Sequence, residues 1–282
     1  TGHALVIGLG SGITCGSVLR HPVEALDVVE IASEVVECNH YFSNENNHFI
    51  SDPRAKIYID DATSFLKTSS KKYNCIISEP SNPWIAGISD LYSVEFFNRC
   101  KSQMNTGGVL AQWFHTYDVS NEIFKLVLNT VSEVFPFVSI WKATDADIIL
   151  LASVTPLSIS FNEMEQKMKE PLIAQELARI NMYDVPALLS TQVVSARNNP
   201  YAFNKSEVNT EKKPLLEFLA PVSLFTHESV SILDSLDERF TFQDKNLWFS
   251  EYIQQRPLTF ENCMNIARYR FNSQIGDLAV AY

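Results

Sequence analysis

A glycine-rich loop, VIGLGSG at residues 6–12, follows an apolar, strand-like run. Glycines let the backbone approach a ligand closely, and a helix start offers free N–H groups. A dinucleotide site needs the spacing GxGxxG, but Ile13 and Cys15 stand where its third glycine would fall. The spacing present, GxGxG, favours a site of the S-adenosylmethionine type, with a plain strand-to-helix turn as the alternative. The loop residues predicted to contact this ligand are Gly8, Gly10, Ser11 and Gly12.

Two acids follow the next strand-like runs and suit a nucleoside. Glu30 closes the second run, 18 residues after Gly12, and an acid at that place accepts hydrogen bonds from ribose hydroxyls in nucleoside-binding α/β folds. Asp61 follows the third run and precedes Ala62, and together they are predicted to lie against the adenine, with the carboxylate accepting from its amino group. The alternatives are a solvated acid at position 30 and a helix N-cap at Asp61, and the N-cap is compatible with adenine binding.

The loop SEPSNPW at residues 78–84 carries the acid predicted to act on the reacting group. Ligands bind beyond the carboxyl ends of parallel strands, so Glu79 should face the reactive end of the nucleoside ligand. An alkylamine with a pKa of about 10 is mostly protonated at pH 7. A carboxylate there can hold the ammonium or take its proton. An exposed loop with an incidental acid is the alternative.

Five further residues are predicted to line the site of a second substrate, because they lie in this loop, shortly after it, or at the end of the fifth strand-like run. They are Ser81, Asn82, Asp90, Tyr92 and Gln112. Next to them, Trp113 is interpreted as a packing residue, with acceptor binding as the alternative, and His115 as a solvated loop histidine, with action on an acceptor as the alternative. The six histidines show no HxH or HExxH spacing, which argues against a metal site.

These residues need a sheet to position them, and strand-like and helical segments alternate through residues 1–155. The strand-like runs are 4–8, 26–31, 56–59, 73–78, 109–113, 138–141 and 148–152. The helical patterns are 14–20, 34–42, 62–67, 93–104 and 121–135. Near-continuous apolar strands separated by helices predict an α/β doubly wound domain with a parallel sheet covered on both faces.

Residues 156–282 are predicted to form an α-rich C-terminal region. Strands thin out after Ser158, the stretches 162–181 and 246–275 look helical, and prolines interrupt the sequence between them. Eight of the nine glycines fall between Gly2 and Gly108, which places the ligand-handling loops in the first part of the chain.

Composition limits the function classes. Hydrophobic residues make up 46% of the 282 residues, enough for a substantial core. The 22 basic and 33 acidic residues give a net charge of −11. So acidic a chain, with no Lys/Arg cluster beyond short pairs, argues against a nucleic-acid partner. Small cationic or neutral ligands remain open.

The five cysteines form no CxxC pair, and their odd number fits reduced thiols in a cytoplasmic compartment. The sequence has no run of 18 apolar residues and opens without Met, directly against a strand-like run. It is therefore interpreted as a fragment of a longer protein. Both a membrane region and a β-hairpin are open as the upstream part, and the first would tether the domain to the inner membrane.

In their order and spacing these motifs resemble the spermidine synthase (polyamine aminopropyltransferase) family, most closely the spermidine-synthase-like domains of membrane-fused proteins. The matching pieces are VIGLGSG, VVEI, DPRAKIYIDDATSFL, KYNCIISEPSNPW, DLYSVEFF, NTGGVLAQWF and VNTEKKPLLEFLAP, within residues 3–225. The resemblance implies a class I methyltransferase-like Rossmann fold with a seven-stranded, mostly parallel sheet. It also implies transfer of an aminopropyl group from decarboxylated S-adenosylmethionine to a polyamine, and a homodimer.

Carried over residue by residue, the resemblance is incomplete around the group to be transferred. Glu30 and Asp61 match the family's ribose-binding and adenine-binding acids. Ser11 stands where the synthases place an aspartate that contacts the donor's amine, Glu79 replaces the aspartate taken as the base, and Asn82 replaces a second aspartate. With serine in place of an acid at position 11, the donor ammonium lacks a partner and the carboxylate of intact S-adenosylmethionine is not repelled. One charge-assisted contact of this type changes affinity about 10- to 150-fold.

Three functions are therefore carried forward. The first is aminopropyl transfer to a polyamine-like amine, with Glu79 as the base. The second is an S-adenosylmethionine-dependent methyltransferase, since Asn82, Pro83 and Trp84 resemble in part the Asn-Pro-Pro-Tyr loop of amino-methyltransferases. The third is a catalytically impaired, nucleoside-binding scaffold domain.

Overall fold

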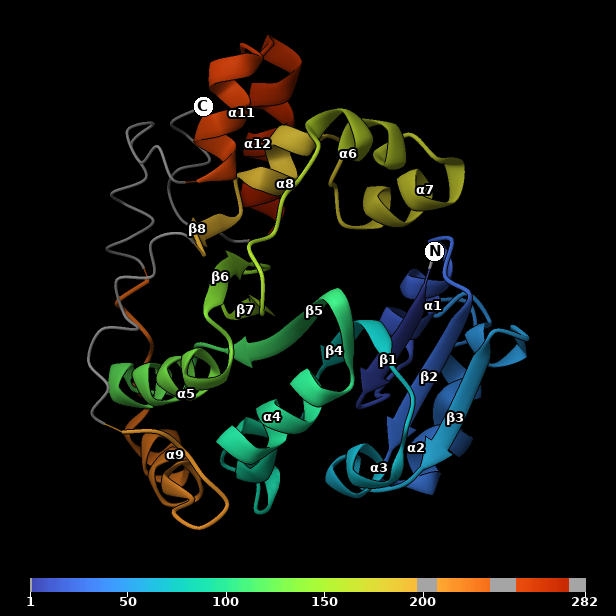
Figure 1. Ribbon diagram of the computed structural model, residues 1–282. Helices are drawn as coiled ribbons and strands as arrows, with labels where there is room; N and C mark the ends of the chain where they lie inside the picture. Colours follow the sequence, from blue (N-terminus) through green and yellow to red (C-terminus); the bar gives the residue numbers. More distant parts are fainter. Residues whose placement is uncertain (1, 197–206, 234–246, 274–282) are drawn as a thin grey trace.

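An eight-stranded mixed sheet forms the centre of the computed structural model, which describes residues 2–196, 207–233 and 247–273. The strands are β1 (His3–Ile7), β2 (Ala25–Glu30), β3 (Ala55–Ile59), β4 (Tyr73–Ser78), β5 (Met104–His115), β6 (Phe137–Lys142), β7 (Asp147–Ser153) and β8 (Gln192–Val194). Their order across the sheet is β3-β2-β1-β4-β5-β7-β6-β8 (Figure 1). The first five strands pair in parallel, and β7, β6 and β8 pair antiparallel.

The α/β fold and all seven predicted strands are confirmed, and β8 adds an eighth strand to the seven expected. Its three residues come from the C-terminal region and extend the sheet beyond β6, where Ile140 pairs with Val194. Strand β5 begins at Met104 rather than Val109 because its first residues pair with Tyr73 ahead of a register irregularity. The preceding helix correspondingly ends at Ser102 instead of continuing into the strand.

Helices cover both faces of the sheet in the first part of the chain. They are α1 (Ile13–Leu19), α2 (Ser33–Cys38), α3 (Ala62–Thr68), α4 (Val94–Ser102) and α5 (Asn121–Val134), with the 3₁₀ turns η1 (Asn39–Phe42), η2 (Phe49–Ser51) and η3 (Ile88–Tyr92). Several begin at side-chain caps: Asp61, Ser93 and Ser120 each accept a hydrogen bond from a backbone N–H in the first helical turn. Such caps fix where each helix starts relative to the preceding strand.

The C-terminal region is helical in its described part. Its helices are α6 (Phe161–Met168), α7 (Pro171–Arg179), α8 (Val185–Leu189), α9 (Leu215–Thr226), α11 (Trp248–Gln255) and α12 (Phe260–Asn272). The single helix predicted over 162–181 is divided by Pro171, which starts α7 because proline suits a first turn and disrupts a helix interior. The helix predicted over 246–275 is likewise two helices, α11 and α12, and its ends, 246 and 274–275, lie outside the described residues.

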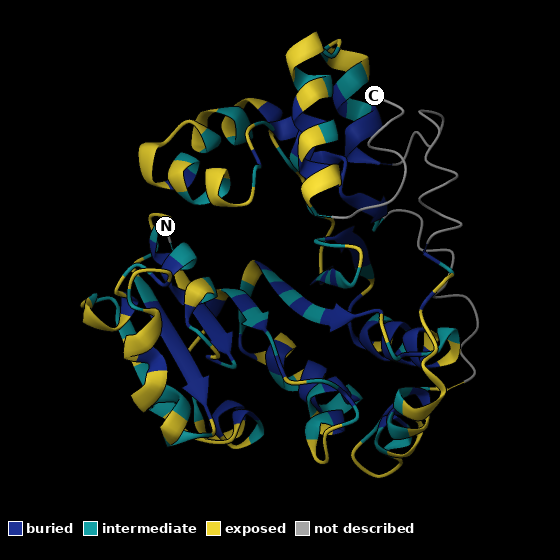
Figure 2. Cartoon of the chain, turned by 180° about the vertical axis from the view of Figure 1, so that it is seen from behind, coloured by how far each residue is buried: buried dark blue, intermediate teal, exposed yellow. Residues whose placement is uncertain are grey.

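The core follows the period-two alternation of the strands. In β7, Ile148 and Leu150 join a cluster with α3, α4, α5 and α9, whereas Ile149 and Leu151 face α6, α8, α11 and α12. A third cluster packs α1 against β1 and β2 on the same face as this second helical group. Figure 1 shows α3, α4, α5 and α9 on one side of the sheet and α6, α8, α11 and α12 on the other, and Figure 2 shows the sheet between them as buried.

The described part of residues 156–282 thus contacts the sheet on both faces: α9 packs with α5 on one, and α6 to α8 with α11 and α12 on the other. The division of the chain into domains at residue 155 stays a prediction. Within the described ranges, no helix combines the length and the apolar character needed to cross a bilayer.

Candidate functional site

A cavity of about 880 Å³ opens at the carboxyl edge of the parallel strands. Strand register brings its walls together, because Ile7 is level with Ser78 on β4 and with Val29 on β2, and Glu30 is level with Ile59 on β3. Eight of the residues predicted from sequence line it: Gly8, Gly10, Glu30, Asp61, Ala62, Glu79, Ser81 and Asp90. The sheet therefore gathers residues that are up to 82 positions apart in the chain, from Gly8 to Asp90.

The glycine loop lies tightly against the β4 end. Gly8 has φ +89°, and a Cβ placed on it would lie 2.4 Å from the backbone oxygen of Glu79. The backbone N–H of Glu79 in turn donates to the Ile7 carbonyl at 2.9 Å. A side chain at position 8 would push the two loops apart, so glycine is required here for both its conformation and its size.

Two buried asparagines that the sequence analysis missed support the same loop. Asn39 Nδ2 donates to the Gly10 carbonyl at 2.9 Å, and Asn46 Nδ2 donates to the Ser11 carbonyl at 3.1 Å and to Asn39 Oδ1 at 2.7 Å. Gly12, with φ +77°, is the N-cap of α1, and a Cβ there would collide with the Phe49 ring. Ser11 and Gly12 thus shape the loop from outside the cavity lining.

Glu30 joins the glycine loop to the end of β2. It is 9% exposed, its Oε2 accepts from the Leu9 N–H at 2.9 Å, and its Oε1 accepts from the Ala32 N–H at 3.0 Å. Two backbone donors fix both carboxylate oxygens at the cavity wall. Each oxygen keeps lone-pair capacity for a further donor from a ligand.

Asp61 is confirmed as the N-cap of α3. Its Oδ1 accepts from the Ser64 N–H at 2.8 Å, and its own N–H donates to Asp60 Oδ1 at 2.8 Å. The side chain is exposed and lines the cavity beside Ala62. Its contact with an adenine amino group stays a prediction.

Glu79 is half-buried where the glycine loop meets β4, and Thr14 in the first turn of α1 holds it. The Thr14 hydroxyl lies 3.0 Å from both Oε1 and Oε2, so its hydrogen is shared between the two oxygens. Burial raises the pKa of the Glu79 carboxyl, and the hydrogen bond from Thr14 opposes that shift. Sequence reasoning did not single out Thr14, because the contact spans 65 positions.

The cavity is acidic. Among the described residues its lining has six carboxylates, namely Glu30, Asp60, Asp61, Glu79, Asp90 and Glu211, against one lysine, Lys67. At Asp90, burial and then the negative charges of Glu211, Glu217 and Asp61 raise the carboxyl pKa. Such a lining attracts cations and repels phosphates.

Three of the predicted second-substrate residues lie behind the cavity. Tyr92 and Gln112 are fully buried, and both donate to the Trp113 carbonyl, at 3.2 and 3.0 Å. Asn82 is half-buried, and its carbonyl accepts from the Ile85 N–H at 3.0 Å. Only Ser81 and Asp90 of the five line the cavity itself.

The interpretation of His115 as a solvated loop histidine is wrong. It is the last residue of β5 and has no exposed surface. Its ring lies 4.7 Å from that of Trp84 and 4.6 Å from that of Tyr117, and neither of its nitrogens has a hydrogen-bond partner among the described residues. Burial lowers the His115 pKa to about 4, which keeps the imidazole neutral. Trp84 thereby packs the loop that carries Glu79 against the end of β5.

The described segment that begins at residue 207 supports the cavity rim. Asn209 is fully buried and donates to the carbonyls of Ser89 and Tyr92 at 2.8 and 3.1 Å, while its Oδ1 accepts from the Leu216 N–H at the start of α9. Glu217 on α9 accepts from the Gly87 N–H at 3.0 Å. These bonds fix η3 and the 85–87 loop. The residues described include no group of three His, Cys, Asp or Glu side chains placed to hold a metal ion.

Comparison with known proteins identifies the family. The model of the spermine/spermidine synthase domain matches residues 1–144 of the 282, which include the glycine loop and all the cavity residues except Glu211. The chain belongs to the spermine/spermidine synthase family. Family membership thus covers the sheet from β1 to β6 and the loops at its carboxyl edge.

A curated relative of this family is the polyamine aminopropyltransferase of Escherichia coli O139:H28 (strain E24377A / ETEC), which is 38% identical over 109 residues. The match covers 38% of each protein, so the chain spans about two fifths of the length of the curated relatives it matches.

Solved structures are similar in fold. A spermidine synthase in complex with the transition-state analogue AdoDATO has 25% identity and a TM-score of 0.53, covering 60% of this chain and 61% of that one. Human methyltransferase-like protein 13, in complex with SAH, has 19% identity and a TM-score of 0.50, covering 62% and 82%. This chain therefore has a fold similar to that of a spermidine synthase and of a methyltransferase, as the family resemblance implied.

Proposed function

We propose that this chain transfers an aminopropyl group from decarboxylated S-adenosylmethionine to a polyamine-type amine. The observation that carries the proposal is the acidic cavity, in which Glu30 and Asp61 lie at the strand ends on one side and Glu79 lies at the β4 end. Both substrates are cationic: the donor has a sulfonium and an ammonium, and the acceptor has several ammonium groups. An excess of carboxylates in a half-enclosed cavity suits such a pair.

The donor nucleoside would lie along the β1 and β2 ends. Glu30 would accept the ribose hydroxyls with the lone pairs left by Leu9 and Ala32, and Asp61 would accept the adenine amino group beside Ala62. Gly10 leaves open space beside the backbone for the donor, and Gly8 lines the same cavity. This arrangement points the sulfonium and its aminopropyl arm toward Glu79.

Glu79 would act as the base in a single displacement. The Glu79 carboxylate first takes a proton from the acceptor ammonium, which frees the nitrogen lone pair. The nitrogen then attacks the carbon next to the sulfonium, the carbon–sulfur bond breaks, and its electrons neutralise the sulfur to give methylthioadenosine, while the new secondary amine remains as an ammonium. A raised carboxyl pKa makes Glu79 a better proton acceptor than an exposed glutamate, and fixed orientation of the two substrates supplies much of the rate.

On the acceptor side, Ser81 and Asp90 line the cavity and would bind the amine directly. Tyr92 and Gln112 are buried and would position the β5 end through the Trp113 carbonyl. Asn82 would order the loop of residues 82–85, because its carbonyl accepts from the Ile85 N–H. The homodimer, the cytoplasmic location and a membrane-fused parent stay predictions.

A methyltransferase is the second candidate, and the neutral loop at Ser11 favours it. Because position 11 carries no negative charge, it would not repel the carboxylate of intact S-adenosylmethionine. Glu79 would then take the proton from a methylated amine.

The experiment is a turnover assay with both donors. The purified chain is incubated with decarboxylated or intact S-adenosylmethionine and with a diamine or triamine, and the nucleoside product is measured. Methylthioadenosine formed from the decarboxylated donor, with an aminopropylated amine in equal amount, is the expected result. S-adenosylhomocysteine from the intact donor would establish the methyltransferase instead. Donor binding without either product would contradict both enzymatic functions and support a catalytically impaired, nucleoside-binding scaffold domain.

A further inference from the structure

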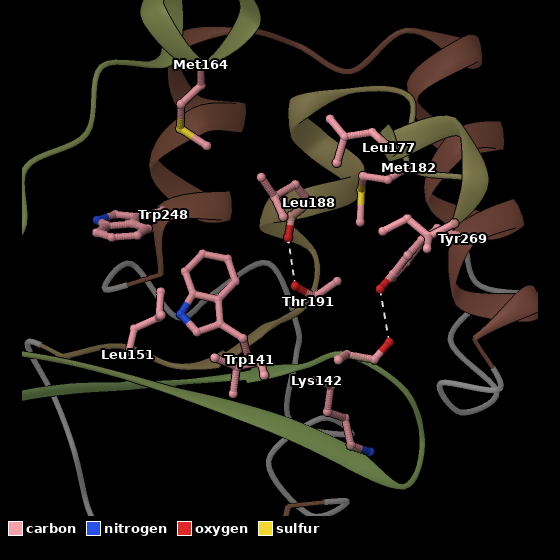
Figure 3. A pocket seen from close by; sticks show the side chains of 13 residues that line it. Trp141, Lys142, Leu151, Met164, Leu177, Met182, Leu188, Thr191, Trp248 and Tyr269 are labelled. Atoms are coloured by element: carbon pink, nitrogen blue, oxygen red, sulfur yellow. Dashed lines mark hydrogen bonds between the residues drawn. The ribbon is translucent and has the colours of Figure 1, made fainter. Parts of the chain in front are cut away.

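A second hollow lies away from the carboxyl edge, between the sheet and the C-terminal helices. It has a volume of about 370 Å³, with Trp141 and Leu151 of the sheet facing Trp248 of α11 (Figure 3). The polar groups at its wall are engaged: Thr191 Oγ1 donates to the Leu188 carbonyl at 2.8 Å, and the Tyr269 hydroxyl donates to the Ala143 carbonyl at 3.0 Å. Lys142 also lines the hollow, but its ammonium points away from it (Figure 3) and lies 3.8 Å from Asp145. What faces the hollow is therefore almost entirely hydrocarbon, indole and thioether.

A neighbouring hollow of about 540 Å³ lies between α1 and the pair α6 and α7. The two share four lining residues, Met164, Leu177, Ile180 and Leu188. All four are flexible or aliphatic side chains, and methionine in particular adapts to irregular ligands. Small side-chain movements would join the two hollows into one apolar channel. We call the inner and outer hollows together the apolar cavity.

The outer end of the apolar cavity carries charge. Glu176 is neutralised there, since it accepts from Ser17 and Asn47 at 3.0 and 2.9 Å and pairs with Arg179 at 3.1 Å. Lys167 lines the same hollow, and its ammonium has no ion pair within the residues described. His21 lies near it, and burial and then the Lys167 charge lower the His21 pKa. Arg20 also lies 3.7 Å from Glu176, and the Glu170 charge opposes that of Lys167 at His21. Among the described residues that line this hollow, Lys167 and Arg179 are cationic and Glu176 is anionic, so the rim is positive in a chain whose net charge is −11.

We propose that the apolar cavity binds a single-chain carboxylate amphiphile, such as a medium-chain fatty acid, with the hydrocarbon lying against the paired rings of Trp141 and Trp248 and the carboxylate at Lys167. Apolar hollows take up apolar ligands because their walls offer water few free polar partners. Both volumes lie within the usual range of ligand pockets, about 300–1,000 Å³. A polyamine would meet Lys167 as a like charge, and a nucleotide would find no polar partners at the inner wall.

This site is separate from the acidic cavity. The two sets of lining residues have no member in common. Ile13 of α1 lines the outer hollow, whereas the next residue, Thr14, lines neither hollow and donates to Glu79. Amphiphile binding can therefore be measured without turnover, and its outcome does not depend on the proposed transferase activity.

The test is calorimetric titration of the full chain with dodecanoate and, in parallel, with uncharged dodecanol, both below their aggregation concentrations. Dodecanoate is expected to saturate one site. Ile180→Trp, a substitution at a half-exposed position that lines both hollows, is expected to weaken binding at least about tenfold by filling the passage. Lys167→Gln is expected to weaken dodecanoate about twofold to fivefold, as for a rim ion pair, and to leave dodecanol unchanged.

Lys169→Gln is the matched control. Lys169 is exposed on the same segment but lines a different pocket, so its loss should not change either affinity. Met164→Phe is a second filling variant that decides the result should Ile180→Trp fail to unfold cooperatively on heating. Absence of saturable binding, or unchanged affinity in the folded filling variants, would overturn the site. Equal losses in the Lys167 and Lys169 variants, or no loss in either, would overturn the assignment of the carboxylate to Lys167.

Discussion

The two ends of the acidic cavity are held in different ways. At the end predicted to bind the nucleoside, the backbone N–H groups of Leu9 and Ala32 fix both oxygens of Glu30. At the end predicted to carry out the chemistry, a single side chain, Thr14, holds both oxygens of Glu79. Backbone donors are present whatever the side chain, whereas a hydroxyl is lost in one substitution. The nucleoside end is thus built into the fold, and the reacting end depends on individual residues.

This contrast matches where the sequence departs from the family pattern. Glu30 and Asp61 are retained, while Ser11, Glu79 and Asn82 differ from the aspartates that the resemblance leads one to expect. Glu79 keeps the charge and gains one methylene, and it is the residue on which the proposed reaction depends. Substitutions at the two ends should therefore separate binding from turnover.

The largest effect is expected for Glu79→Gln. Loss of the proton acceptor should lower kcat by about 100- to 10,000-fold, the usual contribution of a general base. The affinity for methylthioadenosine should change little, because Glu79 lies at the opposite end of the acidic cavity from the predicted nucleoside site. Single-turnover kinetics with titration of methylthioadenosine measures both. An unchanged kcat would show that Glu79 is not the base. Glu79→Asp, which keeps the carboxylate but shortens the side chain by one methylene, serves as the control.

Glu30→Gln should show the opposite pattern. The amide keeps the shape but replaces one acceptor oxygen with a donor that faces the N–H of Leu9 or Ala32, so methylthioadenosine should bind about 100-fold more weakly. With saturating donor, kcat should fall far less than in Glu79→Gln. Equilibrium titration followed by kcat at saturation makes the comparison, and wild-type affinity in this variant would refute the ribose assignment.

Ser11→Asp should increase the selectivity of the cavity between the two donors. Ser11 lies outside the cavity lining, and the family resemblance is what assigns this position to the donor ammonium. On that assignment, a new acid should raise the preference for decarboxylated over intact S-adenosylmethionine about tenfold, since it attracts the first and repels the carboxylate of the second. The ratio of the two dissociation constants is the readout, and Ser11→Asn is the uncharged control. An equal change for both donors would place Ser11 away from the transferable group.

The smallest effect is expected for Thr14→Val, as a change in pH dependence. The hydroxyl stabilises the ionised carboxylate and lowers its pKa, so its removal should raise the Glu79 pKa further. The base is active when deprotonated, so the acid limb of kcat/KM should move to higher pH. Thr14→Ser keeps the hydroxyl and should leave the limb in place. A limb that moves to lower pH would contradict the role given to Thr14.

The sequence predicted the sheet well because buried parallel strands leave apolar runs that end where the chain turns. It also placed eight residues correctly at one edge, since carboxyl ends of parallel strands must meet there. It failed where the deciding contact is distant in the chain. Thr14 meets Glu79 across 65 positions and Asn209 meets Ser89 across 120, and neither has a local pattern.

His115 shows the same limit. Read locally it follows a strand and precedes polar residues, which suggested solvent. Its burial comes from Trp84, 31 positions earlier, and from Tyr117 folding over it. Likewise β8 is only three residues long, and its strand conformation depends on pairing with β6 rather than on its own sequence.

The measurement that tests the central claim most directly is titration of the chain with decarboxylated S-adenosylmethionine, intact S-adenosylmethionine and methylthioadenosine under one set of conditions. The account predicts that methylthioadenosine and the decarboxylated donor bind well and that the intact donor, whose carboxylate meets an acidic cavity, binds more weakly. Tighter binding of the intact donor, or no binding of any of the three, would contradict it.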